Sequence, residues 1–207
     1  VGGNGRTRVY RAYDSITGEV AIKILPPDFF RDAAFHARFD REVKTLTLLE
    51  DPAIVPIIDI DTLDGQPFLV MRYIGGGTLA ERLAQGALPL EDAYRILYDI
   101  ASALDAAAAR GIYHGNIKPS NILFDEAGEV YLTDFSMASP SEGRSASVLN
   151  VLPNTAAYMS PEQVLRGSFD RSSDIYALGA VLYHMLTGQP PVSGATPLQQ
   201  AVEQVSA

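Results

Sequence analysis

The sequence predicts an α+β protein in which a small antiparallel β lobe with one helix precedes a larger, mainly α-helical lobe. Strand patterns dominate the N-terminal part of the chain, and helical patterns dominate the rest. The run Gly75-Gly76-Gly77 lies between the two parts, and because glycine has unusual backbone freedom we interpret it as a hinge. We therefore expect one lobe over residues 1–74 and a second over residues 75–207.

The β-rich part is expected to contain two strand pairs and a helix. Residues 9–25 are rich in strand formers interrupted by turn residues, which predicts a hairpin. Two further strands are predicted over residues 54–60 and 67–73, with the turn-forming Asp64-Gly65 between them. Apolar residues recur at helical spacing over residues 35–49, so a helix is predicted between the strand pairs.

Two long helices are expected to organise the second part. Apolar residues recur at helical spacing from Glu91 to Ala108, which predicts an amphipathic helix closed by Gly111. Residues 173–187 are apolar on nearly every side and stop at Gly188. A helix without a polar face is typical of the buried axis of a domain, so we expect this helix to be buried.

Shorter elements are predicted around these helices. Two short strands are expected over residues 122–124 and 130–133, and a last helical pattern covers residues 197–205. The loop over residues 136–158 is longer than an ordinary connection, and loops of this length usually have a function or are disordered.

Composition restricts the classes of partner. The chain has 207 residues, 47% hydrophobic and 20% charged, which is enough for a substantial core. The net charge of -9 argues against nucleic acid and anionic membrane as partners, because both attract basic surfaces. Cysteine is absent from the sequence, so it offers no disulfide, thiolate metal site or cysteine nucleophile, and we expect a cytoplasmic protein. Neither a membrane-spanning run nor a leader pattern is found, so we expect no membrane contact within this segment.

Four short motifs contain the chemically informative residues. They are Ala21-Ile22-Lys23, His114-Gly115-Asn116-Ile117-Lys118-Pro119-Ser120-Asn121, Asp134-Phe135-Ser136 and Ser160-Pro161-Glu162. Their order over nearly the whole chain resembles the eukaryotic-like protein kinase family, specifically its bacterial serine/threonine branch. The resemblance implies a bilobal kinase-like fold, ATP and Mg²⁺ as cofactors, and a protein substrate or signalling partner.

The resemblance also implies a set of residues that handle phosphate and metal. Lys23 would hold the α- and β-phosphates and pair with Glu42, and Lys118 would contact the γ-phosphate. Asn121 and Asp134 would bind the metal, because amide and carboxylate oxygens are the hard donors that Mg²⁺ requires.

A nucleotide slot is implied by the same comparison. The backbone of Arg72 and Ile74 would hydrogen-bond the adenine edge, and Gly2 and Gly5 would belong to a glycine-rich lid. Asn4 and Thr7 occupy two of the glycine positions of that lid, so we expect it to be looser than usual. The apolar residues of the slot would be Val1, Val9, Ala21, Met71 and Leu123.

The sequence departs from the family pattern at the catalytic motif. Asn116 stands where an aspartate normally accepts the proton of the attacking hydroxyl, and an amide has no useful basicity. Gly115 replaces an arginine that normally grips a phosphate on the activation loop, so we expect any activity to be independent of such a phosphate. Ser136 replaces a glycine and has less backbone freedom. His114 is expected to be a structural residue that stacks on Phe135.

Three functions remain open at this point. The favoured interpretation is a nucleotide-binding pseudokinase with weak or no phosphotransfer that acts as a signalling scaffold. An active serine/threonine kinase and a nucleotide-independent interaction module are the alternatives, and an engineered Asn116 is a further one. The family normally has additional helices in the large lobe and a basic partner for Glu162, so we expect a C-terminally truncated lobe with uncovered apolar surface.

Overall fold

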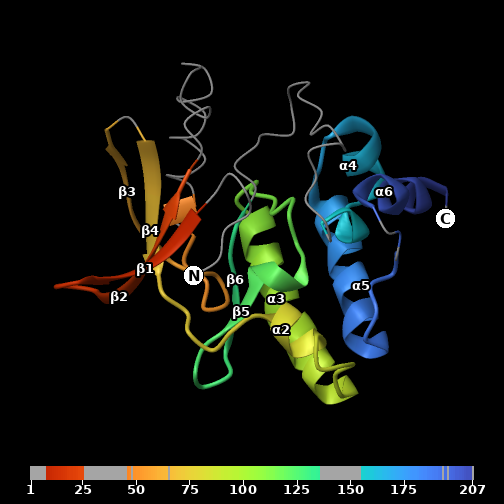
Figure 1. Ribbon diagram of the computed structural model, residues 1–207, viewed down its shortest axis with the longest axis horizontal. Coiled ribbons are helices and arrows are strands. Elements are labelled where there is room, and N and C mark those ends of the chain that lie inside the picture. Colours follow the sequence, from red (N-terminus) through yellow and green to blue (C-terminus); the bar gives the residue numbers. More distant parts are fainter. Residues whose placement is uncertain are drawn as a thin grey trace.

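The computed structural model describes residues 8–25, 46–47, 49–64, 66–135, 155–192, 194 and 196–206. A β-sheet lies at one end of the molecule and the long helices lie at the other, with a short two-stranded sheet between them (Figure 1). Most of the helix predicted over residues 35–49 lies outside the described residues. In the described part, no helix is both long enough and apolar enough to cross a membrane.

The larger sheet is antiparallel with strand order β1-β2-β4-β3. Its strands are β1 (Arg8–Asp14), β2 (Gly18–Ile24), β3 (Ile57–Leu63) and β4 (Gln66–Arg72). The predicted hairpin and the predicted second strand pair are therefore confirmed. Opposed residues of paired strands share a face, so Val9, Lys23, Ala21 and Met71 lie on the same side of the sheet.

The residues just before β3 pair with a different strand than expected. The strand predicted from Ile54 begins at Ile57, because residues 53–55 pair instead with β6 (Val130–Leu132). The Val55 N–H donates to the Leu132 carbonyl at 3.0 Å, and the Leu132 N–H donates to the Ala53 carbonyl at 2.7 Å. This pairing joins the segment leading into the large sheet to the small sheet of β6 and β5 (Ile122–Phe124).

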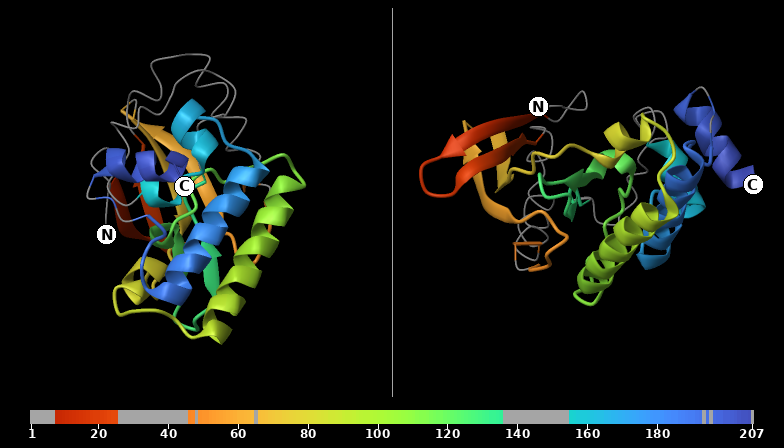
Figure 2. Two further views of the ribbon diagram at one scale, coloured as in Figure 1. Left: turned by 90° about the vertical axis from the view of Figure 1, so that its right-hand side faces the viewer. Right: turned by 90° about the horizontal axis from the view of Figure 1, so that it is seen from below.

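The second lobe is built on two long helices that lie side by side (Figure 2). These are α3 (Leu90–Ala108) and α5 (Arg171–Thr187), close to their predicted bounds. The shorter helical elements are α2 (Leu79–Leu83), η2 (Pro119–Asn121), η4 (Ala156–Tyr158), α4 (Pro161–Arg166) and α6 (Pro197–Ser206). Both α2 and α4 begin with a capping box, in which Thr78 or Ser160 is the N-cap.

The expectation that α5 is buried on all sides is wrong for one face. Ala177, Val181 and Met185 are buried in the core shared with α3. Ile175 and Tyr183, on another face, are 61% and 50% exposed. An apolar helix pattern does not say how many sides are covered. Here α3, η4, α4 and α6 contact α5, and one apolar face is left exposed. The uncovered apolar surface that the sequence predicted on the large lobe is thus present here.

The glycine run between the lobes is tied to β5. The Gly76 N–H donates to the Phe124 carbonyl at 2.7 Å, and the Phe124 N–H donates to the Gly77 carbonyl at 2.9 Å. A Cβ atom on Gly76 would collide with the backbone carbonyl of Asp125. Glycine is therefore required at position 76 for the close approach of two backbones.

We predict opposite effects on stability for alanine at two glycines. Gly76→Ala should lower the free energy of unfolding by about 2 kcal/mol, because the backbone of Asp125 must move to admit the methyl group. Gly179→Ala should raise it by about 1 kcal/mol, because Gly179 lies on an exposed part of α5 with open space around it. Thermal unfolding measures both, and equal effects would contradict the close packing at Gly76.

Candidate active site

One carboxylate, that of Asp174, binds the backbone of the catalytic motif. Asp174, buried near the start of α5, accepts hydrogen bonds from the backbone N–H of His114 at 2.7 Å and of Gly115 at 2.8 Å. Burial raises the pKa of Asp174, and the two hydrogen bonds from backbone N–H groups counteract this only in part. The loop is thereby anchored to the long helix through its backbone.

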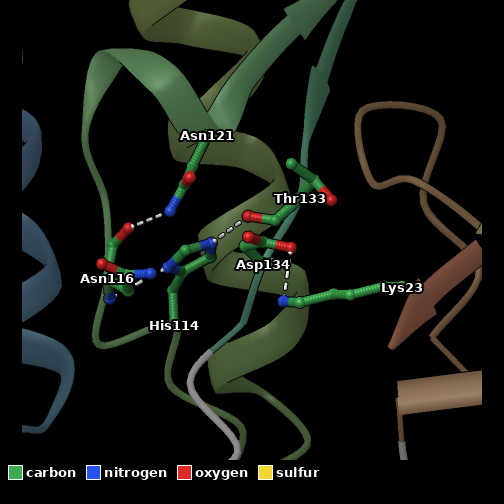
Figure 3. Close-up of polar contacts among 6 residues, drawn as sticks. All are labelled: Lys23, His114, Asn116, Asn121, Thr133 and Asp134. Carbon is green, nitrogen blue, oxygen red and sulfur yellow. Dashed lines mark hydrogen bonds and ion pairs between the residues drawn. The ribbon is translucent and has the colours of Figure 1, made fainter. Parts of the chain in front are cut away.

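His114 is fully buried and its tautomer follows from its partners. Its Nδ1 accepts from the Asn116 N–H at 3.1 Å, so its Nε2 carries the proton and donates to the Thr133 carbonyl at 3.0 Å (Figure 3). Burial lowers the pKa of His114 to about 4, so the ring is neutral. The predicted contact with Phe135 is present, with ring centroids 4.4 Å apart. These contacts account for His114 as a structural residue.

Asn116 is fixed at its backbone at both ends. Its N–H is bound by His114, and its carbonyl accepts from the Asn121 Nδ2 at 2.8 Å. Within the described residues, no hydrogen bond fixes the Asn116 side-chain amide. The position is therefore preorganised while its side chain stays available, and the Asn121 amide oxygen is likewise left as an acceptor.

Lys23 and Asp134 form an ion pair between the two lobes. The Lys23 Nζ lies 2.8 Å from the Asp134 Oδ1, and the lysine side chain is only 12% exposed (Figure 3). Asp134 has φ of +66°, a left-handed conformation that is uncommon outside glycine and is often found at functional sites. β2 supplies the lysine, and the segment following β6 supplies the carboxylate.

Lys118 points toward the segment that precedes η4. It is buried, and its Nζ donates to the Thr155 Oγ1 at 3.0 Å. Burial lowers the pKa of Lys118, and the nearby charge of Lys23 acts in the same direction. Thr155 had no assigned role in binding or catalysis from the sequence, because nothing in the spacing of the chain places its hydroxyl beside Lys118.

The predicted slot residues that are described lie on the larger sheet, just after it, or in the neighbouring strand β5. Met71 and Ile74 belong to a buried cluster against which Ala21 and Leu123 pack, and Val9 lies opposite Lys23 on the neighbouring strand. Arg72 ends β4, and its guanidinium lies 5.2 Å from the centre of the Tyr131 ring. No described contact tests whether these residues bind adenine.

Several predicted residues lie outside the described part of the chain. They include the lid glycines and Glu42, the expected partner of Lys23. The pairing of Lys23 with Glu42 therefore stays a prediction. These residues are Val1, Gly2, Gly5, Glu42 and Ser136.

One neighbour of the catalytic motif was not expected from the sequence. The buried Gln163 of α4 donates from its Nε2 to the Gly115 carbonyl at 2.8 Å, and its Oε1 accepts from the Ser160 N–H at 3.0 Å. The signal for it is the pair Ser160 and Gln163, three residues apart, which is the pattern of a capping box. The helix cap and the catalytic motif thus share one side chain.

Comparison with known proteins agrees with this geometry. Residues 1–207 match the family model of the protein kinase domain. The chain is 39% identical over 209 residues to the serine/threonine-protein kinase PrkC of Bacillus subtilis, covering 100% of this chain and 32% of that protein. It is 37% identical over 197 residues to the probable serine/threonine-protein kinase PknB of Lactococcus lactis, covering 94% and 31%. It is 35% identical over 209 residues to the serine/threonine-protein kinase PknL of Mycobacterium tuberculosis, covering 100% and 52%.

The chain therefore belongs to the protein kinase family. Its relatives identify the branch as that of the bacterial serine/threonine protein kinases, which confirms the resemblance seen in the motifs. The α+β fold with a β-sheet lobe and a helical lobe agrees with this assignment. The chain spans about a third of the length of two of these relatives and about half of the third.

We predict that His114 makes stability fall toward acidic pH. Its folded pKa of about 4 lies below its ordinary value of 6.5, so its contribution is complete above pH 6.5 and is lost as pH falls toward 4. The loss should reach about 3 kcal/mol in total, because each pKa unit corresponds to about 1.4 kcal/mol. Unfolding midpoints between about pH 7 and about pH 5 should therefore fall less steeply in His114→Phe than in the wild type.

His184→Phe is the matched control for this experiment. The pKa of His184 is also lowered by burial, but this histidine is only half-buried. We expect its substitution to flatten the pH dependence less. Identical slopes for the wild type and His114→Phe would contradict the neutral, buried state of His114.

Proposed function

We propose that this chain is a protein kinase-like domain that binds Mg-ATP, transfers phosphate weakly or not at all, and acts as a nucleotide-responsive signalling scaffold. The observation that carries the proposal is that Lys23 pairs with Asp134 while Asn121 binds the backbone of Asn116, a position whose side chain is an amide. Four residues expected to handle phosphate and metal, Lys23, Lys118, Asn121 and Asp134, are among the described residues, and the position expected to supply the proton acceptor carries an amide.

The donor set fits a magnesium-bound nucleotide. Asp134 offers a carboxylate, and Asn121 offers an amide oxygen whose nitrogen is already used toward the Asn116 carbonyl. Mg²⁺ is usually bound by one or two such oxygens together with substrate phosphates, so a larger acidic cluster is not required. Indeed, the described residues contain no group of three or more His, Cys, Asp or Glu side chains that could hold a metal. When bound, Mg-ATP supplies the phosphoryl group and a cation that neutralises part of its charge.

The residues of this chain would then divide the work as follows. Lys23, fixed by Asp134, would hold the α- and β-phosphates, and Lys118 would reach the γ-phosphate from beside Thr155. The Asn116 amide could orient an acceptor hydroxyl by hydrogen bonding, but it could not take its proton. A positioned general base contributes about 10²- to 10⁴-fold to rate, or about 3 to 5 kcal/mol of barrier. Electrostatic positioning would remain, so slow transfer is compatible with the proposal.

An active serine/threonine kinase is the second candidate. It is favoured by the backbone of Asn116, which is bound at its N–H and at its carbonyl, so that the side chain starts from a fixed position. The relatives that are named as serine/threonine kinases favour it as well. A nucleotide-independent interaction module is the third possibility, and the melting experiment below separates it from the first two.

We predict that Mg-ATP raises the melting temperature of the protein. At a concentration about 100-fold above Kd, binding stabilises by about 3 kcal/mol, which corresponds to about 5 to 10 °C for a chain of this size. Lys23→Ala should abolish the shift, and Arg95→Ala, which removes an exposed charge from α3, should leave it intact. No shift in the wild type would refute nucleotide binding and favour the interaction module.

We also predict that Asn116→Asp increases phosphate transfer from labelled ATP by about 10²- to 10⁴-fold. The reason is that the carboxylate restores a proton acceptor at a position whose backbone is already in place. The control is Asn116→Ala, which should not exceed the wild type. A wild type as fast as Asn116→Asp would overturn the pseudokinase assignment in favour of the active kinase.

A further inference from the structure

Gly115, which precedes the degenerate base position, is hydrogen-bonded at both its N–H and its carbonyl. Its N–H donates to the Asp174 Oδ1 at 2.8 Å, and its carbonyl accepts from the Gln163 Nε2 at 2.8 Å. Its φ of +67° lies in the left-handed region, which favours glycine. The backbone of Asn116 therefore continues from a residue that two hydrogen bonds hold in a left-handed conformation.

The side of Gly115 that would bear a side chain faces an aromatic ring. A Cβ atom built on Gly115 would lie 2.5 Å from the Cε2, 2.6 Å from the Cδ2 and 2.7 Å from the Cζ of Phe169. These atoms belong to the body of the ring, so the ring as a whole would have to move. Phe169 thus occupies the space that any side chain at position 115 would need.

The backbone at Phe169 lies between the end of one helix and the capped start of the next. It lies in the short connection between α4 and α5, after Gly167, which ends α4 in a left-handed conformation. The next residue, Asp170, caps α5 by accepting from the N–H groups of Ser172 and Ser173. The backbone of Phe169 is therefore placed directly before the start of the helix that also contributes Asp174.

We propose that Phe169 is a positioning residue that holds the catalytic motif by packing on Gly115, in place of a charged side chain at that position. The motif is then fixed by an apolar contact from Phe169, together with the hydrogen bonds to Asp174 and Gln163. This inference rests on the proposed function only for the role of Asn116, because the packing itself needs no nucleotide. Gly115 and Phe169 form a matched pair in which either residue limits the size of the other.

A double-mutant cycle measures the pair directly. Gly115→Ala alone should lower the melting temperature by about 4 °C or more, because the methyl group meets the ring and the left-handed backbone is strained. In a Phe169→Ala background the same substitution should cost at most about half as much, because only the backbone strain remains. Equal costs in both backgrounds would overturn the proposal. Phe169→Leu replaces Phe169→Ala in the cycle if the alanine variant does not fold.

Hydrogen exchange separates positioning from general stability. Phe169→Ala should speed exchange of the His114 and Gly115 amides at least about tenfold relative to the β1–β2 hairpin, and Phe169→Leu should restore part of the protection. Uniform acceleration over the whole chain, or none at the motif, would refute a positioning role. In an Asn116→Asp background, Phe169→Ala should lower kcat and leave the KM for ATP unchanged. Because exchange and melting are measured without nucleotide, they stand even if the proposed function fails.

Discussion

The site depends on a buried carboxylate that binds backbone instead of another charge. Asp174 lies in the first turn of α5 and accepts hydrogen bonds from two consecutive N–H groups of the catalytic motif, so it anchors the backbone of the motif to the helix. His114 then bonds to the Asn116 N–H and the Thr133 carbonyl, which fixes the approach to Asp134. Because burial raises the pKa of Asp174, its charge costs free energy that these hydrogen bonds only partly offset. The buried charge of Asp174 therefore serves to position the catalytic motif more than to stabilise the fold.

Local sequence patterns were sufficient to predict most helices and strands, but they were insufficient to predict which elements pack against one another. The hairpin over residues 9–25 and the helix from Glu91 to Ala108 were predictable because period and turn residues are properties of neighbouring positions. The later start of β3 was not predictable, because residues 53–55 pair with β6, which lies far away in the chain. For the same reason the sequence could not show that Tyr183 on α5 is exposed.

The candidate site was predictable through a family resemblance more than through spacing. The chain itself brings Lys23 to Asp134 and Asn121 to the Asn116 carbonyl, across gaps that no local rule connects. Thr155, Gln163 and Phe169 escaped notice because each acts through a contact that exists only in three dimensions. Residue identity alone made Asn116 stand out, since an amide and a carboxylate differ in basicity whatever surrounds them.

The pairing of residues 53–55 with β6 links the segment that leads into the large sheet to the small sheet by backbone hydrogen bonds. Thr133 and Asp134 directly follow β6. A rigid-body tilt of the large sheet would therefore also move the strand next to the Asp134 carboxylate. Lys23 travels with that sheet on β2, and lobe tilt therefore changes both ends of one ion pair at once. By reciprocity, any molecule that tightened the pair would restrain such a tilt, and any protein bound to the sheet would change the geometry of the pair. Under the proposed function, such a linkage would let a bound partner sense the nucleotide without any turnover.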